Sequence, residues 1–506
     1  MSVARVASRA QLGLSAPRVD VEVHLGSGLP QFSIVGLPAT AVKESKDRVR
    51  AALANASFEW PAGRITVNLS PADLPKEGCR YDLPIALGIL QASSQLPCDA
   101  QRLEGWEFYG ELGLAGELKP IRGMVLAAAH AARDGHRILV PAANLAEARI
   151  AARAQALGAP SLLDVCALLG GSSASSSDAD DWQPPQPSQP GAPDLADVRG
   201  QAAAKRALLV AAAGGHSILL VGPPGTGKTM LAQRLPGLLP PLAGGDALDV
   251  AAIASVSSRG FDAREYGRRP FRAPHHSASA NAIIGGGPRA QPGEVSLSHL
   301  GVLFLDELPE FDRRVLESLR EPLESGVVSI SRAAMQVEYP ARFQLVAAMN
   351  PCPCGYLGDT SGRCRCAPPE IARYRARISG PLLDRIDLRV EVPVVGEELM
   401  LDPAAPDFGL DSPAAAARVS AARRLQSERA GLLNSQLGGR EIQKACALDA
   451  RGRLLMAQAR SRFELSARGV HRVLRVARTI ADLDDIRGGI SPRHLAEALQ
   501  LRRIAA

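Results

Sequence analysis

The stretch Gly222-Pro-Pro-Gly-Thr-Gly-Lys-Thr229 decides the fold of this chain. It has the form G-x-x-x-x-G-K-[ST] and lies between the apolar run Ile218–Val221 and the helical pattern Met230–Leu235, so it predicts a strand, a phosphate-binding loop and a helix. Glycines let backbone N–H groups turn toward a phosphate, and the helix N-terminus adds partial positive charge. We expect Lys228 to reach the β- and γ-phosphates of ATP and the Thr229 hydroxyl to bind Mg²⁺. The expected nucleotide-binding residues are Gly222, Pro223, Pro224, Gly225, Thr226, Gly227, Lys228 and Thr229.

A second apolar run, Gly301–Leu305, ends in the two carboxylates Asp306 and Glu307. Uninterrupted apolar runs are typical of strands in parallel sheets that are covered on both faces. At the end of such a strand, Asp306 is expected to bind Mg²⁺, and Glu307 is expected to polarise the water that attacks the γ-phosphate. The two motifs together predict an ATP-hydrolysing α/β domain.

The composition indicates a globular protein with more than one domain. The chain has 506 residues, of which 46% are hydrophobic and 22% charged. It has no apolar run long enough to cross a bilayer, and its N-terminus lacks the apolar core of a secretory signal. A cytoplasmic location is therefore expected, in which the eight cysteines would be reduced thiols or metal ligands.

Residues 171–193 form a polar Ser/Pro/Gln segment that predicts a linker. It separates an N-terminal domain of residues 1–170, in which strand and helix patterns alternate as in an α/β or α+β fold, from an α/β ATPase domain of residues 194–395. Residues 396–506 are expected to form a helical C-terminal domain. Residues 413–506 contain 18 Lys/Arg and 8 Asp/Glu. This basic region indicates a polyanion partner, contacts with the nucleotide, or an ordinary solvated helical surface.

Three further residues are candidates for the hydrolysis step. Asn350 ends the apolar strand pattern Phe343–Met349, where it could orient the attacking water or simply cap the turn. Arg385 is a candidate for an arginine that reaches the γ-phosphate of a neighbouring subunit, and its alternative role is an ion pair with an adjacent acid. In the helical domain, Arg468 is preferred to Arg475 as a further arginine for the nucleotide.

The layout resembles the AAA+ ATPases, and within them the magnesium-chelatase-like, ComM/YifB-type family. The resemblance extends over nearly the whole chain, and its ATPase-domain motifs follow in family order. These motifs are Arg269–Ser279, Gly285–Gly287, Pro292–His299, Leu319–Glu324, Asn350–Gly355 and Gly380–Leu388. The resemblance implies an AAA+ domain with a helical lid and a homo-oligomeric ring, expected to be a hexamer. It also implies action on DNA, as a branch-migration helicase in transformation and recombination.

The N-terminal domain resembles the ribosomal-S5-like fold of Lon-type proteases at Pro75–Pro84 and Gly110–Gly123. Those proteases use a serine and a neutral lysine. The serine position falls on Arg80 and the lysine position on Val125, so we expect no peptidase activity. Cys79 is adjacent to the serine position but would point to the opposite face of an extended segment.

Four cysteines, Cys352, Cys354, Cys364 and Cys366, lie within 15 residues. Four thiolates suit structural Zn²⁺, although the C-x-C spacing departs from the usual C-x₂-C, and the alternative is a tight loop with free thiols. The segment between Glu324 and Tyr339 predicts a β-hairpin, and Arg332 in it is a candidate DNA contact that could equally be a solvated arginine. His275 and His276 could line a pore or fix a loop.

The expected function is an ATP-driven ring motor that acts on DNA. One alternative is an ATPase subunit that drives insertion of a metal into a porphyrin, which would need a partner with a metal-binding domain. A second is an ATP-dependent protease, against which Arg80 and Val125 argue. A third is an ATP-regulated scaffold, against which the presence of Glu307 and Arg385 argues.

Overall fold

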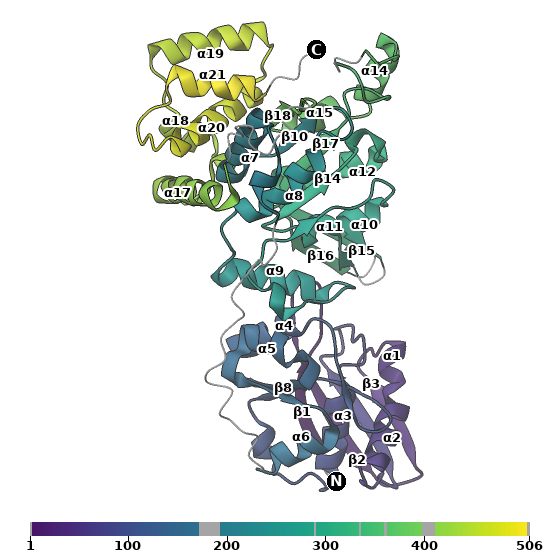
Figure 1. Cartoon of the computed structure of the whole chain (residues 1–506). Coiled ribbons are helices and arrows are strands. Elements are labelled where there is room, and N and C mark those ends of the chain that lie inside the picture. The colour runs from purple at the N-terminus through teal and green to yellow at the C-terminus, as the bar shows by residue number, and fades with distance from the viewer. Residues whose placement is uncertain are drawn as a thin grey trace. The chain divides into compact units, whose positions relative to one another are not determined.

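The computed structural model describes residues 3–171, 193–287, 290–332, 335–358, 362–396 and 410–502, and the chain divides into two compact units (Figure 1). The first unit comprises Met1–Pro187, Ala243–Gly267 and Ser331–Tyr339. The second comprises Ser188–Leu242, Arg268–Ile330 and Pro340–Ala506. The predicted linker lies outside the described residues except for its two end positions.

The first unit is built on a seven-stranded mixed sheet in the order β3-β4-β2-β1-β5-β8-β9. In β2, Val19, Val21 and Val23 are buried and alternate with more exposed polar residues, as expected for a strand that is covered on one face. Helix α3 packs on β1 and β2, and at Gly88 a Cβ would lie only 2.5 Å from Val23 Cγ2. The strands are β1 (Val3–Arg9), β2 (Arg18–Gly26), β3 (Gln31–Val35), β4 (Arg64–Ser70), β5 (Trp106–Phe108), β8 (Arg137–Pro141) and β9 (Ala156–Ala159), with the small pair β6 (Glu111–Leu112) and β7 (Leu118–Lys119). The helices are α1 (Thr40–Lys43), α2 (Ser45–Asn55), α3 (Asp82–Ala92), α4 (Met124–Arg133), α5 (Leu145–Ala152) and α6 (Leu162–Leu169).

Segments far along the chain complete this first unit. Helix α9 (Gly244–Val256) packs against α4, and the Gly123 N–H donates to the Ser255 carbonyl at 2.8 Å. Val337 lies so close to Gly13 that a Cβ there would be 2.2 Å from Val337 Cγ1. The unit is therefore discontinuous in sequence, because residues between the ATPase motifs contribute to its packing.

The second unit contains a five-stranded sheet in the order β11-β14-β17-β10-β18, and every pairing in it is parallel. The strands are β10 (Ile218–Val221), β11 (Phe271–Arg272), β14 (Val302–Leu305), β17 (Gln344–Met349) and β18 (Leu388–Glu391). All residues of β10, β14 and β17 are buried, which explains their uninterrupted apolar sequences. Because these three strands are parallel neighbours, their carboxyl ends meet at one edge of the sheet.

The helices of the second unit include five that follow residue 410 and share one hydrophobic core with the sheet. Ala415, Val473 and Leu495 belong to the same buried cluster as Ile218. Helices α17 and α20 both pack on α7. These elements are α7 (Ala202–Gly214), α17 (Ser412–Ala430), α18 (Gly439–Ala445), α19 (Ala450–Arg462), α20 (Ala467–Leu483) and α21 (Pro492–Gln500).

The remaining elements belong to the second unit, except that most of β16 and the last two residues of β15 belong to the first. They are α8 (Lys228–Leu238), α10 (Ala280–Ile284), β12 (Gly285–Gly286), β13 (Gln291–Pro292), α11 (Glu294–Leu297), α12 (Arg313–Ser318), α13 (Arg320–Ser325), β15 (Val327–Arg332), β16 (Met335–Pro340), α14 (Pro368–Arg375) and α15 (Gly380–Arg385). The architecture confirms the mixed α/β class and the helical C-terminal region that the sequence predicted. Among the described residues, no helix combines the length and the apolar character needed to span a bilayer.

Candidate nucleotide-binding and hydrolysis site

The phosphate loop joins β10 to α8, and its glycines adopt conformations that other residues rarely take. Gly225 and Gly227 have φ values of +79° and +89°. At Gly222 a Cβ would lie 2.1 Å from the Val392 carbonyl oxygen, so a side chain is excluded there. Lys228 is the first residue of α8, which places the helix N-terminus directly after the glycines.

A pocket of about 350 Å³ lies beside this loop. It is lined by the loop and the start of α8, by Asp306 and Glu307 after β14, and by Met349 and Asn350 at the end of β17. This volume lies within the usual range of about 300–1,000 Å³ for ligand pockets. The structure thus brings the predicted loop, carboxylates and asparagine together.

Two side chains of this segment, Lys228 and Thr229, contact residues at the ends of the neighbouring strands. Lys228 Nζ donates to the carbonyl oxygens of Gly222 at 2.7 Å and Pro223 at 2.8 Å, and to Asn350 Oδ1 at 3.3 Å. Burial lowers the pKa of Lys228, while the charges of Asp306 and Glu307 act in the opposite direction. Thr229 Oγ1 donates to Asp306 Oδ2 at 2.8 Å. A hydroxyl and a carboxylate oxygen this close form the kind of oxygen donor set that fits Mg²⁺.

Glu307 has a contact that the sequence analysis missed. Its Oε2 lies 3.1 Å from His276 Nδ1, and its backbone has a left-handed φ of +52°. His276 packs edge-on against Phe311 with ring centroids 6.4 Å apart. The signal for this contact was the His275-His276 pair that follows β11, because β11 and β14 are neighbouring parallel strands and the residues after them meet.

Arg385 and Arg468 lie in a different pocket, of about 860 Å³. Both approach Glu324: Arg385 Nη2 lies 2.6 Å and Arg468 Nη1 3.7 Å from its Oε1. No local pattern in the sequence predicted that one carboxylate would hold both arginines. The alternative lid residue, Arg475, instead donates to the Leu437 carbonyl and is partly buried, whereas the Arg468 side chain is 73% exposed.

A buried ionic network connects the sheet to the C-terminal helices just beyond Arg385. Asp387 contacts His216 Nδ1 at 3.4 Å and Arg472 Nη1 at 3.0 Å. Burial would raise the pKa of Asp387, but the hydrogen bond and charge of His216 and the charges of Arg472 and Arg502 outweigh it and lower that pKa to about 2. The network fixes helix α20, and with it Arg468, relative to the sheet.

Comparison with known proteins identifies the family. Residues 194–400 match the family described as "Magnesium chelatase, subunit ChlI", residues 21–144 match "Subunit ChlI of Mg-chelatase", and residues 409–502 match "Magnesium chelatase, subunit ChlI C-terminal". The chain is 47% identical to "Competence protein ComM" of Haemophilus influenzae, over 99% of this chain and 98% of that protein. It belongs to the ComM/YifB-type, magnesium-chelatase-like family.

Other relatives support the same assignment. "Uncharacterized protein YifB" of Salmonella typhimurium is 48% identical, over 100% of this chain and 98% of that protein. "Magnesium-chelatase 38 kDa subunit" of Cereibacter sphaeroides is 27% identical, over 30% of this chain and 51% of that protein. As a ComM/YifB-type AAA+ protein, the chain has the features of an ATPase that uses ATP and Mg²⁺.

Arg80 and Val125 of the first unit are the residues that the predicted resemblance to Lon-type proteases places at the serine and lysine positions. Arg80 is 7% exposed and donates to Gln11 Oε1 at 2.7 Å and to the Arg122 carbonyl at 3.0 Å. Val125 is fully buried in a cluster with Ala251 of α9. Neither side chain can act as a nucleophile or a base, and both have packing roles instead.

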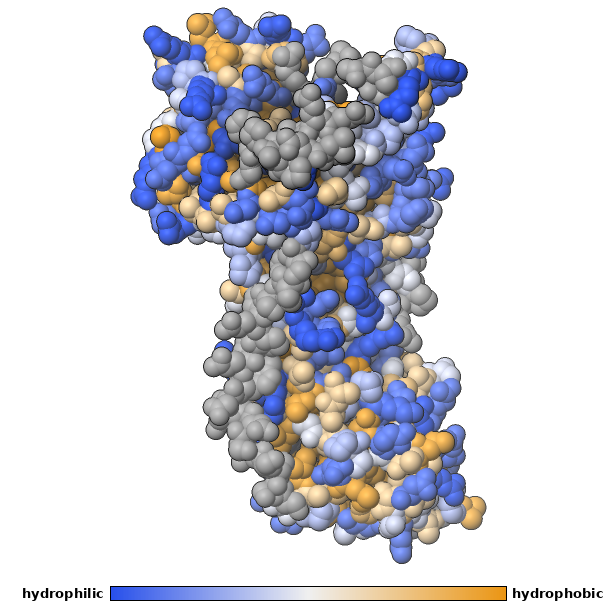
Figure 2. Space-filling model, in the orientation of Figure 1, coloured by the Kyte–Doolittle hydropathy of each residue, from blue (hydrophilic) through white to orange (hydrophobic). Residues whose placement is uncertain are grey.

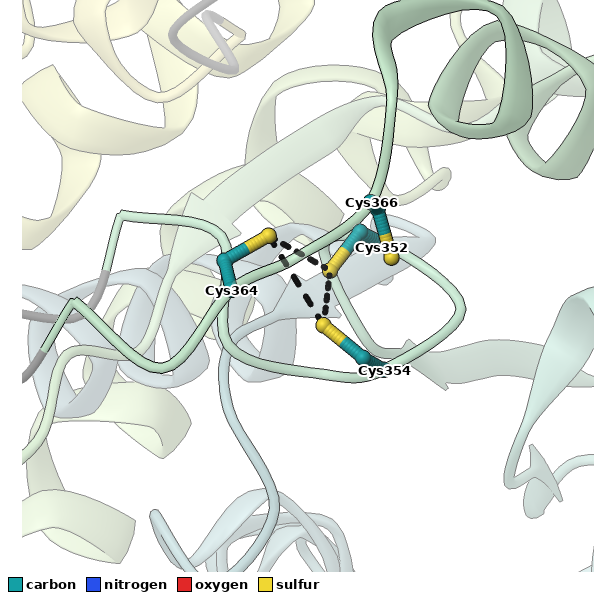
Figure 3. Close-up of side chains that lie close together, drawn as sticks. All are labelled: Cys352, Cys354, Cys364 and Cys366. Carbon is teal, nitrogen blue, oxygen red and sulfur yellow. Dashed lines mark hydrogen bonds between the residues drawn. The ribbon is translucent and has the colours of Figure 1, made fainter.

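The remaining candidates are four cysteines on the loop after β17 and Arg332 at the end of β15. Cys352, Cys354, Cys364 and Cys366 come together in one cluster (Figure 3). Arg332 ends β15, but its side chain lies outside the described part of the chain, so its role as a DNA contact stays a prediction.

Proposed function

We propose that this protein is a ring-forming motor, a homo-hexamer in which ATP bound to one subunit is hydrolysed with the help of the next. Within one chain, the pocket at the phosphate loop supplies Lys228, Thr229 and Asp306 for the nucleotide and Mg²⁺. Glu307 polarises the attacking water and Asn350 orients it. These residues bind the nucleotide and activate the attacking water. They leave the charge that develops on the γ-phosphate only partly neutralised.

The separation of the two arginines from this pocket carries the proposal. Arg385 and Arg468 line the larger pocket and not the one at the phosphate loop, among the described residues. Both guanidiniums are held by Glu324, which is 46% exposed. In a head-to-tail ring the γ-phosphate of a neighbour would replace Glu324 as their anionic partner. Both arginines therefore act on the neighbouring subunit's nucleotide.

DNA is the proposed substrate, and the C-terminal helices contribute to its binding. Figure 2 shows hydrophilic residues over much of their surface. Besides Arg468, the exposed basic side chains on this region are Arg418, Arg424, Arg440, Lys444, Arg451, Arg453, Arg460, Arg462, Arg487 and Arg493. Such a surface attracts the phosphate backbone without reading sequence. Together with Arg332 at the hairpin and the competence protein among the relatives, this supports branch migration of DNA in transformation and recombination.

Metal insertion into a porphyrin is the weaker alternative. The chelatase subunit from Cereibacter sphaeroides aligns with 30% of this chain, whereas the ComM and YifB relatives align with nearly all of it. A scaffold without turnover would not need Glu307 and Asn350 at the pocket, so the geometry favours hydrolysis.

The proposal is tested by measuring ATP hydrolysis with and without single-stranded, duplex and branched DNA at two stated salt concentrations. We expect DNA to stimulate turnover, branched DNA to be unwound, and both effects to weaken at higher salt because phosphate contacts release counterions. The Lys228→Ala variant serves as the inactive control. The matched control is Lys46→Ala, which removes an exposed lysine of the first unit and should keep its activity. ATP turnover that no DNA alters at either salt concentration would refute a DNA motor.

A further inference from the structure

The loop between β17 and α14 gathers four thiols. In Figure 3 the side chains of Cys352, Cys354, Cys364 and Cys366 converge. The first two cysteines lie ten or more positions before the last two in the sequence. The Sγ–Sγ distances are 3.4 Å for Cys352–Cys354, 3.8 Å for Cys352–Cys364 and 3.7 Å for Cys354–Cys364. All four sulfur atoms lie within 4.8 Å of one another.

These distances match a metal site and not a disulfide. A disulfide requires sulfur atoms about 2.05 Å apart. Four thiolates about 2.3 Å from a tetrahedral Zn²⁺ lie about 3.8 Å from each other, which is the spacing that three of the pairs approach. The four thiols therefore converge despite the unusual C-x-C spacing. The chain turns directly after Cys354, at Gly355, which has a φ of +85°.

The surroundings of the cluster suit thiolates. The backbone N–H groups of Tyr356 and Arg365 donate to Cys354 Sγ, so they would stabilise its negative charge in the metal-bound state. Cys352 is buried and Cys354 is exposed, so a metal ion would be anchored on the protein side and reachable from solvent. We propose that Cys352, Cys354, Cys364 and Cys366 bind one Zn²⁺, and that this ion holds the loop that carries Asn350 against the phosphate loop.

The second half of this proposal depends on the proposed ATPase function and follows from contacts at the loop. A Cβ at Gly355 would lie 2.8 Å from Pro224 Cδ of the phosphate loop and 3.8 Å from Asn350 Cγ. Cys352 lies two positions after Asn350, whose side chain contacts Lys228. Arg375 Nε of α14 donates to the Pro351 carbonyl at 3.4 Å. The zinc would tie the end of β17 to the start of α14 and so fix Asn350, which makes the four cysteines positioning residues for hydrolysis.

The metal itself is tested by elemental analysis of the full-length protein purified without chelators. We expect one zinc per chain. Cys354→Ser, at the exposed thiol, should lower the zinc content, whereas Cys98→Ser, outside the cluster, should leave it at one. Should the serine variant fail to fold, titration of metal-depleted wild-type protein with Co²⁺ decides, since four thiolates give the visible absorption of tetrahedral cobalt. Absence of stoichiometric zinc together with no such absorption would overturn the site, and stoichiometric iron would overturn its assignment to zinc.

The positioning role is tested by removing and restoring zinc in the wild-type protein. Removal should lower kcat for ATP hydrolysis by about tenfold or more, because loss of supporting contacts typically costs 10–100-fold in activity. ATP affinity should change little, and added Zn²⁺ should restore kcat. Unchanged kcat in zinc-free protein would refute the positioning role and leave the metal site standing. A zinc-loaded protein that hydrolyses no ATP would refute the proposed function, so the two failures are distinguishable.

Discussion

Mixing two inactive variants should restore ATP hydrolysis if Arg385 acts on the neighbouring subunit. Glu307→Gln removes the group that we propose polarises the water, and Arg385→Ala removes the guanidinium that we propose acts on the neighbour's γ-phosphate. An arginine in that role is worth about three to five orders of magnitude in rate. Each variant alone should therefore be inactive. The structure supports separate roles, since Glu307 lines the pocket at the phosphate loop and Arg385 lines the other pocket.

The expected extent of rescue follows from this geometry. In a head-to-tail ring, one boundary works when its nucleotide-binding subunit retains Glu307 and the neighbour retains Arg385. When equal amounts of the two variants assemble at random, about a quarter of the boundaries have this pairing. If boundaries act independently, turnover should therefore reach about a quarter of the wild-type value.

The assay is steady-state ATP hydrolysis of the mixture over a range of variant ratios, with a maximum expected near equal amounts. Differently tagged variants and pull-down establish that mixed rings form. A mixture of Arg385→Ala with Lys228→Ala should show the same rescue, because Lys228 lies on the same side of the boundary as Glu307. Mixed rings that stay inactive at every ratio would refute an arginine supplied by the neighbour.

Three further predictions concern single residues. Lys228→Ala removes a charged donor near the phosphates. Because each charged hydrogen bond lost costs about 1.5–3 kcal/mol, ATP binding should weaken by about 100-fold or more in a calorimetric titration. Retained tight binding would contradict the assignment of the phosphate loop. Thr229→Val removes the hydroxyl that donates to Asp306. It should raise the Mg²⁺ concentration for half-maximal turnover by about tenfold, and an unchanged Mg²⁺ dependence would exclude this pair as its site. Asp387→Asn should lower the urea-unfolding free energy by about 2–3 kcal/mol at pH 7, since the pKa falls from 3.8 to about 2. The stabilisation by Asp387 is present above its unfolded pKa and is lost as the pH falls through its folded pKa. The difference in unfolding free energy between wild type and variant should therefore shrink below about pH 4. A difference that is constant with pH would refute the ionic account.

The sequence predicted those parts of the site that depend on local pattern. The phosphate loop needs glycines at fixed positions, and buried parallel strands need uninterrupted apolar runs, so Lys228, Asp306 and Asn350 could be assigned to neighbouring strand ends. In the structure all three line one pocket. The mixed α/β class and the helical C-terminal region followed from the same periodicities.

Contacts between distant segments could not be predicted in this way. The pairing of His276 with Glu307 depends on β11 lying beside β14, and strand order is not encoded in either strand alone. Glu324 lies in a segment that was recognised, yet its pairing with both Arg385 and Arg468 depends on how α13, α15 and α20 pack. The first unit also includes α9, although α9 lies between segments of the second unit in the sequence. Helix α9 packs on α4 through apolar residues that form no recognisable motif.

The central claim is that the nucleotide lies at a boundary between subunits, and sedimentation of the Glu307→Gln variant tests it most directly. This variant should bind ATP and Mg²⁺ without turning them over. The account predicts a closed hexamer with saturating ATP and Mg²⁺. A strictly monomeric protein under saturating ATP and Mg²⁺ would contradict it.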